Sequence, residues 1–348
     1  DPARLCRTPL DARSQADGFG SLTRFSRRRS AAAGATLALE RTTNLTQAQK
    51  PHPFDGSAAT YDRDFTSTSV GRRQRDRVWD VFDRTLPPAG RFLDLGCGTG
   101  EDAVWLARRG TSRVVGFDAS QAMLDVARTK VDAAGVGDRV TLRRMDLGRM
   151  DLESDPCGDP FDGAVSDFGA LNCIEDRRPL AGALSRWLNP GAPLVVVLMG
   201  PWCAWEISWH LLRLDPRAAL RRRRQGREAH LDGGGSTRVC YPRPKQLRRE
   251  FSPLFEHLET IGVGVFLPPS YIDPVLAHRP GVLSFLSRLE ERLGALKPWS
   301  WMADHVALVY RKPRIWVDDQ PSSRHRKSGQ SEAGSGSCSR SSSRQIPA

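Results

Sequence analysis

The segment Phe92–Gly110 places a strand, a glycine-rich turn and a helix in direct succession. The apolar run Arg91–Leu95 predicts a buried strand of a parallel sheet. Gly96, Gly98 and Gly100 follow at alternate positions, so the backbone can turn tightly and approach a ligand that a Cβ would keep away. The helical pattern after them has one apolar side, formed by Ala103, Val104, Leu106 and Ala107. This order predicts a ligand held against a loop at the end of the strand.

The residue at position 101 separates two kinds of ligand. A dinucleotide loop of the form G-x-G-x-x-G would need a third glycine there, and the chain has Glu101, which opposes a pyrophosphate at the helix N-terminus. The sequence D-L-G-C-G-T-G at 94–100 closely resembles motif I of the class I S-adenosylmethionine-dependent methyltransferases. The cofactor of that family is a sulfonium without phosphate. The alternatives are a nicotinamide enzyme and a glycine turn without a ligand.

The resemblance covers roughly residues 55–312 and implies a fold. We expect an α/β, doubly wound, mostly parallel seven-stranded sheet with an antiparallel terminal strand pair, as in Rossmann-like methyltransferases. The expected strands are 91–95, 113–118, 139–147, 161–168, 194–199, 255–266 and 304–310. Insertions at about 200–238 and 267–301 would add a helical cap to a methyltransferase domain at 51–312.

Two acidic residues follow the second and third expected strands. Ligands of doubly wound sheets lie at the carboxyl ends of the strands, where a carboxylate can accept both hydroxyls of a ribose. The resemblance gives this role to Asp118; the alternative is that Asp118 caps the helix 119–130, a task that Ser120 could share. It also implies that Asp146 and the backbone of Leu147 contact the adenine, although Asp146 could instead be a solvated loop residue.

Other cofactor contacts are carried over from the family. Tyr61 precedes motif I as part of a Tyr-Asp pair, on a segment that closes over the cofactor in related methyltransferases; it could also simply pack on the domain surface. The complete expected cofactor set is Tyr61, Asp94, Gly96, Cys97, Gly98, Gly100, Asp118, Ala119, Met123, Asp146, Leu147 and Asp167. No metal site is expected.

The loop after the fourth strand, residues 167–172, faces the transferred methyl group in the family fold. It lacks the N-P-P-[FY] signature of many DNA and protein amide N-methyltransferases. Asp167 and Asn172 could orient a substrate hydroxyl or carboxylate, or could be structural. His210 is a further weak candidate for a base, and no residue is identifiable as the catalytic base from sequence.

The first insertion carries an aromatic stripe. Trp202, Trp205, Trp209 and Leu212 recur at helical spacing, and the run Arg221–Arg224 follows. Three interpretations stay open: a lid lining an apolar substrate pocket, ordinary packing of an added helix, and an interfacial membrane helix over about 202–224. The arginine run by itself is typical of a solvated face.

Both ends of the chain are rich in small and basic residues. Residues 1–50 hold nine Lys and Arg against four acids, and residues 313–348 hold six against three. These two segments supply most of the formal charge of +12, and their low-complexity composition predicts disorder. Nucleic acid binding is therefore only weakly indicated by the overall charge.

The remaining composition favours a cytoplasmic protein. Seven scattered cysteines without a C-x-x-C pair support neither a zinc site nor a disulfide framework and fit a reducing compartment. No apolar stretch approaches the ~20 residues of a spanning helix, and the first residues lack the apolar core of a secretory signal. The Arg and Ser bias there loosely resembles a transit sequence; a misread gene start would explain it equally well.

The resulting hypothesis is S-adenosylmethionine-dependent methyl transfer to a small, apolar or aromatic acceptor, because the insertion is tryptophan-rich and N-P-P-[FY] is absent. The alternatives are an RNA or other macromolecule methyltransferase that uses the basic segments, and a non-catalytic protein that binds the cofactor or associates with a membrane.

Overall fold

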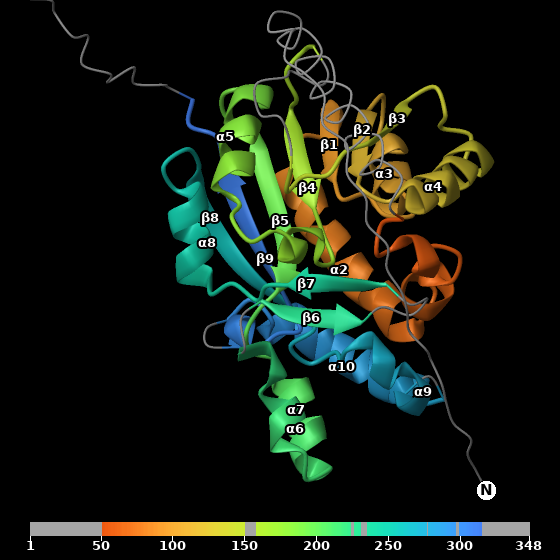
Figure 1. The fold of residues 1–348 in the computed structure, drawn as a ribbon, viewed down its shortest axis with the longest axis vertical. Helices are drawn as coiled ribbons and strands as arrows, with labels where there is room; N and C mark the ends of the chain where they lie inside the picture. Colours follow the sequence, from red (N-terminus) through yellow and green to blue (C-terminus); the bar gives the residue numbers. More distant parts are fainter. Residues whose placement is uncertain are drawn as a thin grey trace, which may run out of the picture.

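The computed structural model describes residues 51–149, 158–223, 226–230, 235–276, 278–296 and 299–314. Its centre is a seven-stranded sheet in the order β3-β2-β1-β4-β5-β9-β8 (Figure 1). The strands are β1 (Arg91–Leu95), β2 (Arg113–Asp118), β3 (Val140–Arg144), β4 (Gly163–Ser166), β5 (Pro193–Met199), β8 (Glu256–Val263) and β9 (His305–Arg311). The predicted fold class is confirmed, with each expected strand present and several of them shorter than expected.

The direction of the strands determines which residues meet. Strands β1 to β5 pair in parallel, so their carboxyl ends share one edge. Strand β9 runs antiparallel to both neighbours, and its first residue, His305, pairs with Met199 at the end of β5. Both insertions emerge at this edge, because one follows β5 and the other lies between β8 and β9.

Helices cover both faces of the sheet. The face packed by α2 (Ser69–Thr85), α3 (Glu101–Ala107) and α4 (Gln121–Ala133) buries Val78, Leu106 and Val131. The opposite face is covered by α5 (Arg178–Trp187) and α8 (Pro244–Phe251). Two helical layers therefore enclose the sheet, as a parallel sheet requires.

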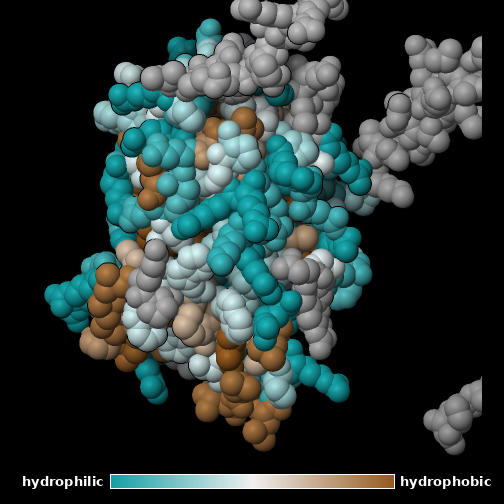
Figure 2. Space-filling model, turned by 90° about the vertical axis from the view of Figure 1, so that its left-hand side faces the viewer, coloured by the Kyte–Doolittle hydropathy of each residue, from teal (hydrophilic) through white to brown (hydrophobic). Residues whose placement is uncertain are grey.

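The two insertions form what we call the cap, the described part of residues 200–302. It contains α6 (Ala204–Leu212), α7 (Pro216–Ala219), a 3-10 turn at Arg221–Arg223, the hairpin β6 (Arg227–His230) and β7 (Ser236–Val239), 3-10 turns at Ser270–Ile272 and Trp299–Trp301, α9 (Asp273–Leu276) and α10 (Pro280–Leu293). The hairpin was not predicted. Figure 1 shows α6 and α7 projecting from the lower end of the molecule, where Figure 2 shows a group of hydrophobic side chains.

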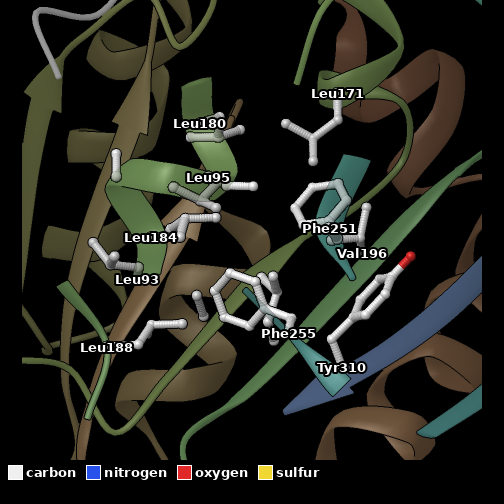
Figure 3. Close-up of a cluster of buried hydrophobic side chains, with 14 of the residues drawn as sticks. Leu93, Leu95, Leu171, Leu180, Leu184, Leu188, Val196, Phe251, Phe255 and Tyr310 are labelled. Atoms are coloured by element: carbon white, nitrogen blue, oxygen red, sulfur yellow. The ribbon is translucent and has the colours of Figure 1, made fainter. Parts of the chain in front are cut away.

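The core between the sheet and α5 and α8 is made of large apolar side chains (Figure 3). Leu93, Leu95 and Val196 project from the sheet toward Leu184 of α5 and Phe251 of α8, and all five are buried. Tyr310 of β9 stacks on Phe251 with ring centroids 5.2 Å apart. This packing fixes the sheet edge on which the candidate site is built.

Apart from residues 313 and 314, both ends for which disorder was predicted lie outside the described residues, as does Arg224. Within the described residues, no helix combines the length and the hydropathy needed to cross a membrane.

Candidate functional site

The loop after β1 adopts the conformation that its glycines predict. Gly96, Gly98 and Gly100 have φ values of +76°, +51° and +79°, in the left-handed region where other residues are strained. A Cβ at Gly96 would collide with the Cβ of Ala170, whereas a Cβ at Gly98 would have nothing within 4 Å. The loop therefore packs closely against the chain after β4 at Gly96 and borders open space at Gly98.

Asp118, at the end of β2, is joined directly to this loop. Its Oδ2 accepts a hydrogen bond from the Gly98 N–H at 2.9 Å, and its Oδ1 accepts one from the Ser120 N–H at 2.8 Å. Burial raises the pKa of Asp118, and these two N–H groups lower it in part. Ser120 caps α4 through Met123 N–H, so the capping is done by Ser120 and Asp118 keeps lone pairs for a ligand.

A buried ion cluster lies beside the glycine loop. Arg75 of α2 contacts Asp102, at the start of α3, and reaches Asp167, at the end of β4, at 3.3 Å. Asp102 also accepts a hydrogen bond from the Trp79 indole at 2.7 Å. Although burial acts in the opposite direction, the charge of Arg75 holds the pKa of Asp102 below its ordinary value. Burial, together with the charge of Asp102, raises the pKa of Asp167 well above its ordinary value.

Asp94 of β1 adds a third acid to this cluster. Its side chain is buried, and its Oδ2 has no hydrogen-bond partner among the described residues. Burial and the neighbouring charge of Asp102 raise the pKa of Asp94 well above its ordinary value. The cluster thus holds three acids and one arginine. A cationic ligand would balance the excess of acidic groups.

This charge arrangement tests the cofactor that the resemblance implies. S-adenosylmethionine carries a sulfonium and an ammonium against a single carboxylate, so it has a net positive charge. The orphaned Oδ2 of Asp94 and the open space at Gly98 fit such a group. A dinucleotide would bring a negative pyrophosphate toward the same acids, so the residues present fit the sulfonium better.

The segment before α2 is fastened to the glycine loop by polar contacts. Asp62 accepts a hydrogen bond from the Thr99 hydroxyl at 2.7 Å and pairs with Lys130 of α4 at 2.8 Å. Asp55 accepts one from the Ser120 hydroxyl at 2.6 Å. Tyr61 is partly buried, with burial raising the pKa of its hydroxyl and the charges of Arg75 and Asp167 acting on it. The structure thus brings Tyr61 to the ion cluster.

The other predicted cofactor residues lie at the same sheet edge. Cys97 lies in the loop and Met123 lies in α4, and both side chains are buried. Ala119 follows Asp118 directly. Asp146 is exposed after β3 and accepts a hydrogen bond from the Gly148 N–H at 3.0 Å, while Leu147 packs against the core. The contacts of these residues with a cofactor stay predictions.

The three candidates for catalysis differ in what surrounds them. Asp167 is held by Arg75 in the ion cluster. The Asn172 amide donates to the carbonyls of Met199 and Cys240 and accepts from the Met199 N–H, so it ties the loop after β4 to β5 and β7. His210 lies in α6, which Figure 1 places at the end of the molecule away from β1, so the structure does not bring it to the others.

The structure instead places His305 beside the loop after β4. Its buried ring meets Phe168 edge to face at 5.2 Å, and Phe168 also contacts Phe65 at 4.8 Å. Nδ1 of His305 lies 3.3 Å from Oδ2 of Asp304 without forming a hydrogen bond to it. Arg222 donates to the same Asp304 at 2.6 Å.

The interpretation of the arginine run as a solvated face is wrong for Arg222. Arg222 is buried, and it pairs with Glu206 at 2.8 Å as well as with Asp304. Arg221 pairs with Glu206 at 2.5 Å. Glu206 of α6 is itself buried and pairs with both arginines, so this part of the run packs toward the protein interior.

The tryptophan stripe does not form one packed face either. Trp202 precedes α6 and is 40% exposed, and Leu212 at the other end is 83% exposed. Trp205 donates its indole N–H to the Phe266 carbonyl at 2.9 Å. Ordinary core packing of the whole stripe is therefore wrong.

Sequence analysis missed Arg75 and Asp102, although a signal for Arg75 exists. The buried face of α2 includes Val70, Gln74, Val78 and Phe82, and Arg75 belongs to that face by helical spacing. A charged residue on an apolar face indicates a buried partner. Its partners, in α3 and after β4, cannot be read from the spacing.

Comparisons with known proteins agree with this geometry. The family model of a methyltransferase domain matches residues 92–191. A demethylmenaquinone methyltransferase of Symbiobacterium thermophilum is 33% identical over 189 residues, which are 48% of this chain and 72% of that protein. One of Lactiplantibacillus plantarum is 33% identical over 144 residues, 41% of this chain, and this chain spans 59% of its length.

The chain is also similar to solved structures. The CcbJ methyltransferase of Streptomyces caelestis shares 18% identity with this chain, with a TM-score of 0.49, over 76% of this chain and 98% of that one.

Proposed function

Because the chain belongs to the class I S-adenosylmethionine-dependent methyltransferase family, we propose that it transfers a methyl group from S-adenosyl-L-methionine to a small, apolar or aromatic acceptor. The observation that carries the proposal is the acid surplus of Asp94, Asp102 and Asp167 around one arginine, next to the open side of Gly98. A site of this charge favours a cationic cofactor over a phosphate-bearing one.

When bound, the cofactor supplies an electrophilic methyl group on a sulfonium. Asp118 would accept hydrogen bonds from the ribose hydroxyls of the cofactor, and Asp94 would pair with its ammonium group. The segment 51–67, fastened by Asp55 and Asp62, would exclude water from that side. Positioning and water exclusion can supply much of the rate of such a direct transfer.

Two features support an apolar or aromatic acceptor. Phe65, Phe168 and His305 form a chain of ring contacts beside the loop after β4. The relatives named demethylmenaquinone methyltransferases act, by that name, on an aromatic quinone precursor. An acceptor carbon or hydroxyl loses a proton when it gains the methyl group, and His305, whose ring meets Phe168 beside the loop after β4, is the base we assign to it.

The test is isothermal titration with S-adenosylmethionine on the Asp94→Asn variant. We expect a loss of affinity of at least about tenfold, ~1.4 kcal/mol, because the amide cannot balance a cation. The matched control is Asp125→Asn, which changes a side chain on α4 that is paired with Arg128 at the surface, and which should bind normally. Normal affinity in Asp94→Asn would contradict the cofactor site.

The same variant separates lost binding from lost folding. The raised pKa of Asp94 means that the folded state holds a proton the unfolded state releases, so wild-type stability falls as pH rises above the ordinary Asp pKa. Each unit of such a rise costs about 1.4 kcal/mol at high pH. Asp94→Asn should therefore melt above the wild type at neutral pH and match it near pH ~4. A variant that melts lower at both pH values would contradict the buried acid surplus.

A further inference from the structure

The projecting pair α6 and α7 ends in an apolar tip. We define the tip as residues 211–217, from the last turn of α6 to the start of α7. Leu212 is 83% exposed, Leu214 is 90% exposed and Leu211 is half exposed. Single exposed leucines are ordinary, but three within four positions at the end of a projection form a patch. Figure 2 shows hydrophobic side chains gathered at this lower end of the molecule.

Leu214 is also strained. Its φ is +58°, a left-handed conformation that costs a residue with a Cβ about 1–2 kcal/mol. Leu214 is also the most exposed large hydrophobic side chain among the described residues, in a turn where its N–H donates to the Leu211 carbonyl. A glycine there would relieve the strain, so neither folding nor solubility accounts for leucine at this position.

The base of the projection is rigid, which lets the tip act as one piece. Trp205 donates to the Phe266 carbonyl, and Glu206 is buried against Arg221 and Arg222. The tip is thus carried by a helix anchored to the sheet edge through Asp304.

Two exposed arginines lie within the apolar tip. Residues 204–223 contain five arginines against two acids, and one of these acids, Asp215, caps α7 through the Ala218 N–H at 2.9 Å. Arg213 and Arg217 are exposed within the tip itself, and Arg213 lies over the Trp209 ring at 3.9 Å. An apolar tip with two exposed arginines matches a bilayer of anionic lipid, because the leucines can enter the acyl boundary while the arginines meet the headgroups.

We propose that the tip docks the protein on the surface of an anionic phospholipid bilayer by inserting Leu211, Leu212 and Leu214. A convex projection suits a deformable lipid surface, whereas a second copy of the chain would need a broad complementary face. The inference concerns where the enzyme works and does not depend on the acceptor, so it stands or fails apart from methyl transfer.

The experiment is flotation of the full chain with vesicles of phosphatidylcholine, with and without phosphatidylglycerol. We expect binding to the anionic vesicles only. The double variant Leu212→Ser, Leu214→Ser should lose at least about tenfold in affinity, since each buried leucine contributes ~1.5 kcal/mol or more. Arg213→Gln with Arg217→Gln should lose about fivefold per arginine, ~1 kcal/mol each.

Two controls keep the basic ends of the chain from giving a false result. Leu258→Ser changes an exposed leucine on the edge strand β8, and Arg108→Gln with Arg113→Gln removes two exposed charges from the opposite edge of the sheet. Both should bind vesicles like the wild type. Leu214→Gly should bind vesicles more weakly while melting no lower than the wild type, because it removes the strain.

Three results would overturn the proposal. The first is equal binding to neutral and anionic vesicles, and the second is vesicle binding that the leucine variants leave unchanged. The third is a dimer in solution that Leu212→Ser, Leu214→Ser converts to monomer without any change in flotation, which would assign the tip to contact between copies.

Discussion

The glycine-loop region, residues 91–133, and the cap are held in shape by different forces. In the first, β1, the loop and α3 follow each other directly, and their conformation comes from the backbone freedom of Gly96, Gly98 and Gly100. In the cap, buried charges bridge distant segments: Arg222 joins Glu206 to Asp304, and Glu290 of α10 accepts hydrogen bonds from the N–H groups of residues 264–267. The loop at 96–100 is set by local geometry, whereas the cap is set by pairing that exists only after folding.

This difference determines which substitutions destabilise each region. A glycine loop fails when a side chain is added, whereas an ion-paired cap fails when a side chain is removed. The following changes test that contrast, in order of expected size.

The largest effect is expected from Arg222→Leu, which leaves Glu206 short of one partner and Asp304 without its arginine. Breaking a buried ion pair from one side costs about 3–5 kcal/mol, to be measured as the free energy of unfolding in urea. Arg223→Leu is the matched control. Arg223 is the next residue in the same run and is exposed beside Trp202, so its loss should change stability by about 0.5 kcal/mol or less. Equal losses in both variants would remove the contrast between the two regions.

The second effect is expected at His305, which lies beside the loop after β4. With a hydroquinone acceptor and methyl-labelled cofactor, His305→Gln should lower kcat about 100-fold, ~2.7 kcal/mol, with unchanged cofactor affinity. His210→Gln, on the projecting helix, should leave kcat at the wild-type level. A similar fall in both variants would argue for indirect damage to the cap.

The smallest effect on stability is expected in the glycine-loop region. Gly98→Val places a Cβ at φ +51°, which costs about 1–2 kcal/mol, and Gly135→Val does the same at φ +66° after α4. Neither Cβ meets an atom within 4 Å, so both variants should unfold at similar urea concentrations. Only Gly98→Val should lose cofactor affinity, because its side chain enters the space beside Asp118. If both bind normally, that space is not the cofactor site.

Most strands of the sheet could be predicted from sequence because each one is recognisable from its own residues. Each parallel strand is a short apolar run bounded by turns, and the glycines after Leu95 fix where the first one ends. Asp118 was placed at the loop for the same reason, since the carboxyl ends of parallel strands share one edge.

The ion cluster and the cap could not be predicted because the positions of their charged residues depend on contacts with partners far along the chain. Arg75 meets Asp167 across 92 residues, and Arg222 meets Asp304 across 82. Spacing alone shows neither that an arginine run turns inward nor that His305 reaches Phe168. The hairpin β6–β7 lacks the alternating apolar pattern that predicts a strand, so its pairing was missed.

The close contact between Gly96 and Ala170 has a consequence for how such an enzyme can diversify. Under the proposed function the chain after β4 would face the acceptor, yet at position 170 it rests on the loop that would hold the donor. A larger residue there would push against the donor side even when it suits a new acceptor. The route to new specificities therefore runs through the cap and the rings around Phe168, while position 170 must stay small.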